Sequence, residues 1–330
     1  MEINELSKKA MGGTELMLDR LHSSIDPAIL NEFQIIPTRV RELDESRYRI
    51  LWIHDTCDDP ETYHLNNGGY NKFHKLVFVS YYQMYSFIRK YNIPFSKCTV
   101  IENGIAPIEI TSKELYDKFH TNEIRMIYTS TPHRGLEILV PVFNEIKTEY
   151  PYIHLDVFSS FSLYGWPERD KQYESLLNTC KNSERIHYYG SQPNTVVRQH
   201  LKQSNLFVYP SIWEETSCLC LIEAMSAGCV SIHSSLGALP ETSLKLNCMY
   251  DYDEDLVRHR DRFKAKLCEF LDNFQSNRTL AISTAEVARA NANDLYDWSK
   301  LSKKWKALLI SILKESPIKE ITKARFVYRT

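Results

Sequence analysis

Residues 206–228 read LFVYPSIWEETSCLCLIEAMSAG. The four apolar residues 206–209 are typical of a strand that is buried on both faces of a parallel sheet. A polar loop with the adjacent acids Glu214 and Glu215 follows, and the sequence then becomes apolar and helical until Gly228, a residue type that favours helix C-termini. This succession of strand, loop and helix is part of a βαβ unit and predicts an α/β fold.

Short apolar runs alternate with helical periods through most of the chain, which is the pattern of doubly wound parallel sheets. The chain of 330 residues suits two domains, because a domain usually has about 100–200 residues. We therefore predict two Rossmann-like domains that face each other across a cleft, where nucleotide ligands bind outside the carboxyl ends of the strands. The predicted strands are 50–53, 76–79, 99–101, 126–128, 153–158, 186–189, 206–209 and 230–233.

The predicted domain boundaries follow from a turn at Asn103-Gly104 and from Pro107, after which a new series of strands begins. We assign residues 1–107 to the first domain and residues 108–295 to the second. Helices are expected from Asp253 to about residue 313, and the last segment, 296–330, is expected to pack back toward the first domain.

The composition is that of a globular protein, with 43% hydrophobic and 25% charged residues. A formal net charge of −2 gives no electrostatic reason to expect a nucleic-acid partner. The first residues lack the apolar run of a signal peptide, no apolar stretch is long enough to span a membrane, and the eight cysteines form no CxxC pair. We expect a cytoplasmic protein, with contact to a membrane surface left open by the basic residues Lys314, Lys319, Lys323, Arg325 and Arg329.

The helix that follows the acidic loop is expected to begin near Ser217, whose hydroxyl would cap it. The free backbone N–H groups of such a helix start, here residues 216–219, and its positive dipole end favour a diphosphate. Glu223 lies about two turns into this helix among apolar residues. A carboxylate in such surroundings needs a partner, and sugar hydroxyls are suitable.

Glu215 and Glu223 are separated by seven residues, with Tyr-Pro-Ser before them and Glu-Ala-Met-Ser-Ala-Gly around the second. This E-x7-E block resembles glycosyltransferase family 4 and related retaining glycosyltransferases. The resemblance implies the two-domain GT-B fold, a nucleoside-diphosphate-sugar donor, transfer with retention and no metal cofactor. It also implies that Glu215 contacts the donor sugar, that Glu223 contacts the ribose hydroxyls, and that Thr216, Ser217, Cys218 and Leu219 contribute to the donor site.

Arg134 and Gly135 stand where the family usually has Lys-Gly or Arg-Gly, in the loop after the first strand of the second domain. A guanidinium in this loop would hold diphosphate oxygens with two hydrogen bonds and stabilise the charge that develops on the leaving nucleoside diphosphate. The family often has an arginine five positions earlier. This sequence has Thr129 there, so one phosphate contact is unaccounted for.

Three smaller similarities add candidate residues. Gly12 and Gly13 resemble the glycine loop of the family's first domain, although the full strand that usually precedes this loop is missing, so we expect a reduced first domain. His54 ends the strand 50–53, a position at which the family often has a histidine that would contact a donor hydroxyl or orient the acceptor. Tyr189 and Gly190 match the strand end near which the nucleotide base is usually bound.

Three alternatives remain open. Asp251, Asp253 and Asp255 would suit the divalent metal of a GT-A glycosyltransferase, although acids just before a helix, here Asp253 and Glu254, are also expected to cap it. The fold also carries nucleotide-sugar epimerases and phosphorylases. Finally, an inactive relative would act as a binding or scaffold protein. If the chain is a GT-B glycosyltransferase, as the resemblance implies, the expected acceptor is a glycan, a lipid-linked glycan or a similar hydroxyl compound.

Overall fold

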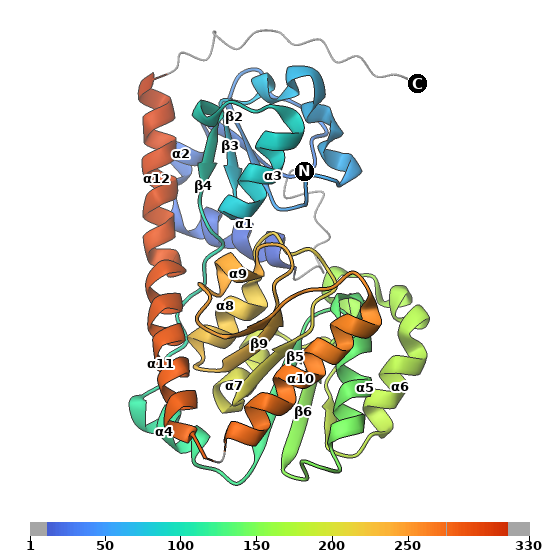
Figure 1. The fold of residues 1–330 in the computed structure, drawn as a ribbon. Coiled ribbons are helices and arrows are strands. Elements are labelled where there is room, and N and C mark those ends of the chain that lie inside the picture. The colour runs from blue at the N-terminus through green and yellow to red at the C-terminus, as the bar shows by residue number, and fades with distance from the viewer. Residues whose placement is uncertain (1–11, 275, 316–330) are drawn as a thin grey trace. The chain divides into compact units, whose positions relative to one another are not determined.

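The computed structural model describes residues 12–274 and 276–315, which form two compact units (Figure 1). The first unit contains residues 12–104 and 298–315, and the second contains residues 105–297. Each unit has its own parallel sheet, so the predicted α/β class is confirmed. Within the described residues, no helix combines the length and apolar character that a membrane span requires.

The sheet of the first unit has the strand order β1-β2-β3-β4 and is parallel throughout. All six residues of β2 are buried, as its continuous apolar run predicts. Leu51 and Ile53 face the core beneath α3, whereas Trp52 packs on Trp305 of α12 with the ring centroids 4.7 Å apart. The strands are β1 (Phe33–Pro37), β2 (Tyr48–Ile53), β3 (Lys75–Phe78) and β4 (Cys98–Val100).

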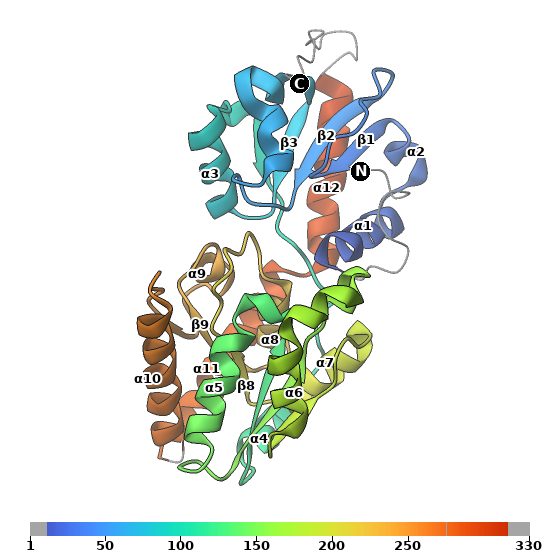
Figure 2. The same cartoon turned by 90° about the vertical axis from the view of Figure 1, so that its right-hand side faces the viewer.

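The helices of the first unit come from the first 100 residues and, in the case of α12, from residues 298–315. The indole N–H of Trp298, at the start of α12, donates to Ser24 at the end of α1 over 2.7 Å, and α12 lies beside α1 (Figure 2). The predicted basic tail beyond Lys314 lies outside the described residues. The helices are α1 (Gly13–Ser24), α2 (Pro27–Leu30), α3 (Tyr81–Tyr91) and α12 (Trp298–Glu315), with 3-10 turns at η2 (Pro60–Lys72) and η3 (Phe95–Lys97).

The sheet of the second unit has the order β10-β9-β8-β5-β6-β7. The chain moves from β5 outward to β6 and β7, then returns to the other side of β5 with β8. The topological switch point therefore lies between β5 and β8, where open α/β sheets bind ligands. The strands are β5 (Ile124–Thr129), β6 (Ile153–Phe158), β7 (Ile186–Tyr188), β8 (Leu206–Tyr209), β9 (Val230–Ser234) and β10 (Cys248–Tyr250).

The helices of the second unit form two groups, because α5 contacts α6 and α10, whereas α8 contacts α7 and α11. Right-handed crossovers place these groups on opposite faces of the sheet (Figures 1 and 2). The helices are α4 (Ser112–Phe119), α5 (Leu136–Ile146), α6 (Glu174–Asn182), α7 (Asn194–Gln203), α8 (Leu219–Ser226), α9 (Leu239–Thr242), α10 (Leu256–Phe274) and α11 (Arg278–Leu295), with 3-10 turns at η4 (Pro132–Arg134), η5 (Phe161–Tyr164) and η6 (Pro167–Tyr173).

The eight predicted strands are all present, but two further strands, β1 and β10, were not predicted. Between β6 and β7 the helical segment is divided, because η6 ends at Tyr173 and α6 begins at Glu174. The first unit is the smaller of the two, with a four-stranded sheet against six strands in the second.

Candidate active site

The loops after β5 and β8 meet at the switch point because a glycine permits close contact. Gly135 has a φ of +115°, and a Cβ at this residue would lie 2.1 Å from the carbonyl oxygen of Pro210. No other residue type fits that space or favours that conformation. The contact brings the loop that carries Arg134 against the loop that carries Glu215.

Arg134 and Glu215 form an ion pair at this position, as Nη1 of the arginine donates to Oε1 of the glutamate over 2.7 Å. The hydroxyl of Tyr209, the last residue of β8, donates to the same oxygen over 2.5 Å. Glu215 is only 4% exposed, so the two donors compensate for the burial of its charge. Sequence reasoning missed Tyr209, although a tyrosine at the end of a buried strand needs a partner for its hydroxyl.

The electrostatics of the three residues reinforce one another. Burial disfavours the charge of Arg134, but Glu215, together with Tyr164 and Tyr209, more than offsets this and raises the arginine pKa well above its ordinary value. Burial, together with the negative charge of Glu215, raises the pKa of Tyr209 well above its ordinary value, so its hydroxyl remains a donor. The arrangement is thus a charged guanidinium fixed at the carboxyl edge of the sheet by a carboxylate.

Replacing Gly135 with Ala is expected to destabilise the protein by about 3 kcal/mol or more, because the new methyl group would overlap a backbone carbonyl and the φ is unfavourable. Gly190 provides a matched control, since its φ is +66° but a Cβ there would be 3.8 Å from its nearest neighbour. Gly190→Ala should cost only about 1 kcal/mol. Urea unfolding measures the stability of both variants. If the two variants lost the same free energy of unfolding, the contact between the loops would not require a glycine.

Glu223 is also buried and paired, with only 6% of its surface exposed. The side-chain amide of Asn194 donates to both carboxylate oxygens over 3.1 and 3.0 Å, and Arg198 donates to Oε1 over 3.0 Å. The same arginine donates to the carbonyl oxygens of Ala106 and Pro107. Asn194 and Arg198 were not predicted as site residues, because they lie on α7 and share no motif with Glu223.

The helix that carries Glu223 begins later than predicted. Its first residue is Leu219 and its N-cap is Cys218, which makes no side-chain capping bond, so the predicted cap by Ser217 is wrong. The thiol of Cys220 donates to the carbonyl oxygen of Thr129 over 2.8 Å, which joins the first turn of α8 to the end of β5. Residues 216–218 connect Glu215 to α8, and the anion site at this helix start stays a prediction.

Tyr189 and Gly190 follow β7 at the same edge of the sheet. The ring of Tyr189 stacks on Phe158 at 4.6 Å with an interplanar angle of 7° and contacts His200 edge-on. His200 is itself bonded to the buried Asp156 through Nδ1 over 2.8 Å. The Tyr189 ring is thus held by its neighbours on the sheet, and Gly190 supplies the left-handed turn that follows.

The remaining predicted residues lie in the first unit. Gly12 is the extended N-cap of α1, which begins at Gly13, so the two glycines stand at the start of a helix. His54 follows β2, with its ring 4.7 Å from that of Trp52, and burial lowers its pKa to about 3. The imidazole is therefore neutral near pH 7. Burial raises the pKa of the adjacent Asp55 to about 6.

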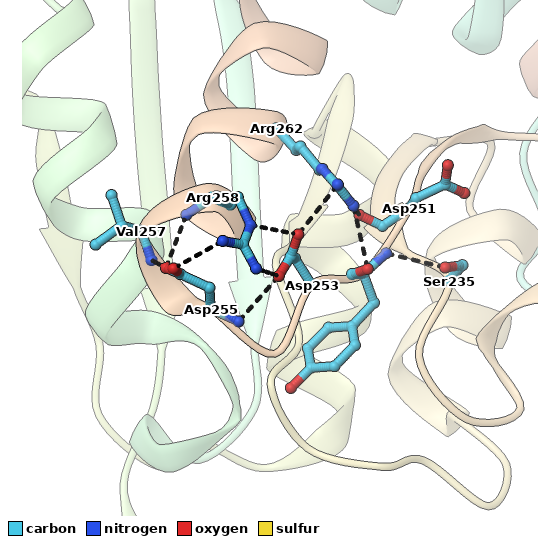
Figure 3. Close-up of polar contacts among 8 residues, drawn as sticks. Ser235, Asp251, Asp253, Asp255, Val257, Arg258 and Arg262 are labelled. Atoms are coloured by element: carbon cyan, nitrogen blue, oxygen red, sulfur yellow. Dashed lines mark hydrogen bonds and ion pairs between the residues drawn. The ribbon is translucent and has the colours of Figure 1, made fainter.

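The acidic segment before α10 is occupied by arginines (Figure 3). Arg258 and Arg262 both pair with Asp253, at 2.8 and 3.0 Å, and these contacts involve its two carboxylate oxygens. Arg258 hydrogen bonding lowers the pKa of Asp253 to about 2. Asp255, rather than the predicted Asp253 and Glu254, accepts from the first N–H groups of α10, and the carboxylate of Asp251 points away from the other two (Figure 3).

Residues 118–247 match the protein family described as "Glycosyl transferases group 1", and this segment contains Arg134, Glu215 and Glu223. One component of the phosphatidylinositol N-acetylglucosaminyltransferase of Arabidopsis thaliana is 25% identical over 117 residues. That match covers 36% of this chain and 24% of the relative, so it spans about a quarter of the relative's length.

Solved structures resemble this chain over a larger share of its length. A glycosyltransferase from Rickettsia africae has a TM-score of 0.65 at 18% identity, covering 96% of this chain and 85% of that one. Anabaena HepE in complex with UDP-glucose has a TM-score of 0.60 at 15% identity, covering 80% and 72%. The fold is GT-B. The pneumococcal O-GlcNAc transferase GtfA, in complex with UDP and GlcNAc, shares this GT-B fold with a TM-score of 0.63 at 17% identity, covering 82% and 54%. The match to the family model and the GT-B fold together support the interpretation that this chain is a glycosyltransferase.

Proposed function

We propose that this protein transfers a sugar from a nucleoside diphosphate to a hydroxyl acceptor, with retention and without a metal ion. The observation that carries the proposal is the Arg134–Glu215 pair at the switch point between β5 and β8. In the reaction, the bond between C1 of the sugar and the diphosphate oxygen breaks and the acceptor oxygen bonds to C1. The acceptor proton passes to the diphosphate or to solvent.

Each residue of the site has a distinct role in this proposal. Glu215 engages Arg134 through Nη1 alone and Nε of this arginine is buried, so the N–H groups of Nη2 are left for the diphosphate, whose charge grows as the bond breaks. The N-terminus of α8 supplies further donors for the diphosphate. Both contacts of Glu215 fall on Oε1, which leaves Oε2 as the acceptor for a donor-sugar hydroxyl. Glu223, held by Asn194 and Arg198, would accept from the ribose hydroxyls.

Other parts of the proposal rest on likeness. The UDP complexes of HepE and GtfA favour a UDP-sugar donor. The Arabidopsis relative is named for a lipid acceptor, which favours a glycan or lipid-linked acceptor and contact with a membrane surface. Gly12, Gly13 and His54 are assigned to the donor sugar and the acceptor, and Tyr189 and Gly190 to the base. The pairing of Asp253 with two arginines argues only against a metal site at the acidic segment before α10.

A thermal-shift comparison of UDP, GDP and ADP, each with Mn²⁺ or EDTA, tests the proposal. A ligand at 100 times its Kd stabilises the folded state by about 2.7 kcal/mol, so one nucleotide should raise the melting temperature by several degrees. We expect that increase to persist in EDTA. Loss of the increase in EDTA would favour a metal-dependent mechanism, and no response to any nucleotide at millimolar concentration would contradict the donor site.

Hydrolysis of the matching sugar nucleotide without acceptor separates an enzyme from a binding protein. We expect slow release of the free sugar, with the donor's anomeric configuration observed first by NMR. Nucleotide binding without any hydrolysis or transfer would identify an inactive relative, for which Thr129 in place of the usual arginine would be the first residue to examine.

A further inference from the structure

Trp213 is an exposed aromatic residue on a fixed loop. Trp213 is 46% exposed, although Ser211, two positions earlier, is fully buried. The Ser211 hydroxyl donates to the carbonyl oxygen of Trp213 and accepts from its backbone N–H, and Ser234 donates to the carbonyl oxygen of Ser211. The loop is therefore anchored to β9, and the indole that it carries is partly exposed to solvent.

The neighbours of Trp213 connect it to the candidate active site. The Arg134 guanidinium lies 5.6 Å from the indole centroid, and the same guanidinium pairs with Glu215. The ring of His133 meets the indole edge-on at 4.8 Å and stacks on Phe161 at 5.2 Å. Burial lowers the pKa of His133 to about 4, so this support is uncharged near pH 7.

From this geometry we propose that Trp213 is a stacking platform for a six-membered sugar ring of the substrate. One face of a pyranose carries mainly C–H groups, and burying this face against an indole removes apolar surface from water. A ring held there would lie beside the Arg134–Glu215 pair, whose charged groups suit the hydroxyls at the ring edge. The inference rests on the proposed function, and the ring would belong to the donor sugar or to an acceptor saccharide.

Trp166 is the matched control within the same unit. It is 40% exposed and, like Trp213, has an arginine over its ring, with the Arg169 guanidinium 4.3 Å from the ring centroid. Trp166 lies before η6, and none of its ring contacts involves Arg134 or Glu215. A sugar that stacks on Trp213 should not depend on Trp166.

Tryptophan fluorescence of the full chain provides the test, since the protein has only five tryptophans. Wild type, Trp213→Phe, Trp213→Ala and Trp166→Phe are titrated with UDP, GDP, UDP-glucose, UDP-GlcNAc, GDP-mannose and the methyl glycosides of the three sugars. A donor ring on Trp213 predicts quenching by a sugar nucleotide beyond that by its nucleotide, absent in Trp213→Phe and retained in Trp166→Phe. It also predicts about tenfold weaker sugar-nucleotide binding in Trp213→Ala, with unchanged nucleotide binding and partial recovery in Trp213→Phe.

The outcomes show whether the ring belongs to the donor sugar or to the acceptor. They also separate a failure of the stacking platform from a failure of the proposed function. Quenching through Trp213 by a methyl glycoside but not by the sugar part of the nucleotide would assign the platform to the acceptor. Nucleotide binding with no sugar response that depends on Trp213 would overturn this inference and leave the proposed function standing. Failure of every nucleotide to bind or to stabilise the protein would overturn the proposed function, and this inference with it.

Discussion

Replacing Glu215 with Gln is expected to lower kcat/KM for the sugar nucleotide by about 100- to 1000-fold, the range for removal of one preorganised charged group from an active site. The amide retains the shape of the side chain and can still accept from Tyr209. It cannot match the charge of Arg134, whose guanidinium would lose its fixed orientation toward the diphosphate. The substitution therefore removes both the proposed contact to the donor sugar and the support of the phosphate-binding cation.

Glu215→Gln should lower the free energy of unfolding by less than it lowers the stabilisation of the transition state. Removing one partner of a fully buried ion pair costs about 3–5 kcal/mol. Because 22% of the Arg134 side chain is exposed and water can solvate it, we expect about 2 kcal/mol from urea unfolding. Glu214→Gln is the control, since it removes the adjacent carboxylate and leaves the pair with Arg134 intact. If Glu214→Gln reduced kcat/KM as strongly as Glu215→Gln, the assignment of the first glutamate would be wrong.

The strands around the site were predictable because their signal is strong. A run of apolar residues such as 206–209 has few alternatives to a strand buried on both faces. Gln34 shows why β1 escaped prediction, since it is a polar residue that is 7% exposed within a strand. Its amide bonds to the carbonyl of Glu42 and the N–H of Asp44, so a loop compensates for its burial. The other strand that was not predicted, β10, has three residues, and only Tyr250 among them is buried.

The wrong helix start at Ser217 has a tertiary cause. A cap contributes only about 1 kcal/mol, which packing readily overrides. Gly237 lies so close to the acidic loop that a Cβ there would be 2.6 Å from the carbonyl oxygen of Glu215, and Ala238 donates to that oxygen. These contacts fix the path of the loop, and the chain turns into α8 only at Leu219. The contacts of Gly237 and Ala238 with this loop cannot be inferred from residues 215–219 alone.

The partners of the two glutamates differ in how far sequence anticipates them. Arg134 was predicted as a diphosphate-binding residue from its loop after the first strand of the second domain, but its pair with Glu215, 81 positions away, was not predicted. Asn194 and Arg198 lie on α7, which comes before the strand that leads to Glu223. Their contact depends on α7 lying beside α8, and the sequence alone does not specify which faces of two helices meet.

Replacing Glu223 with Ala is expected to weaken nucleotide binding by about 10- to 100-fold. A hydrogen bond to a charged group contributes about 1.5–3 kcal/mol, and each 1.4 kcal/mol corresponds to a factor of ten in Kd. Asn194 and Arg198 fix the carboxylate, so it would meet the ribose without first losing conformational freedom. Arg198→Gln should weaken binding by a smaller factor, because Glu223 remains but loses one of its supports.

The ribose assignment can be isolated with a second deletion in the ligand. Calorimetry would compare the nucleoside diphosphate that stabilises the protein with its 2′-deoxy analogue, in wild type, Glu223→Ala and Glu174→Ala, the last an exposed carboxylate on α6. Wild type and Glu174→Ala should both prefer the ribonucleotide, whereas Glu223→Ala should bind the two ligands equally, because the hydroxyl then has no carboxylate to meet. If Glu223→Ala kept the full preference, the carboxylate would not contact the ribose, and its bonds to Asn194 and Arg198 would be structural. Combining Arg198→Gln with Glu223→Ala would show whether the arginine acts through Glu223. If it does, adding Arg198→Gln to Glu223→Ala should not weaken nucleotide binding further.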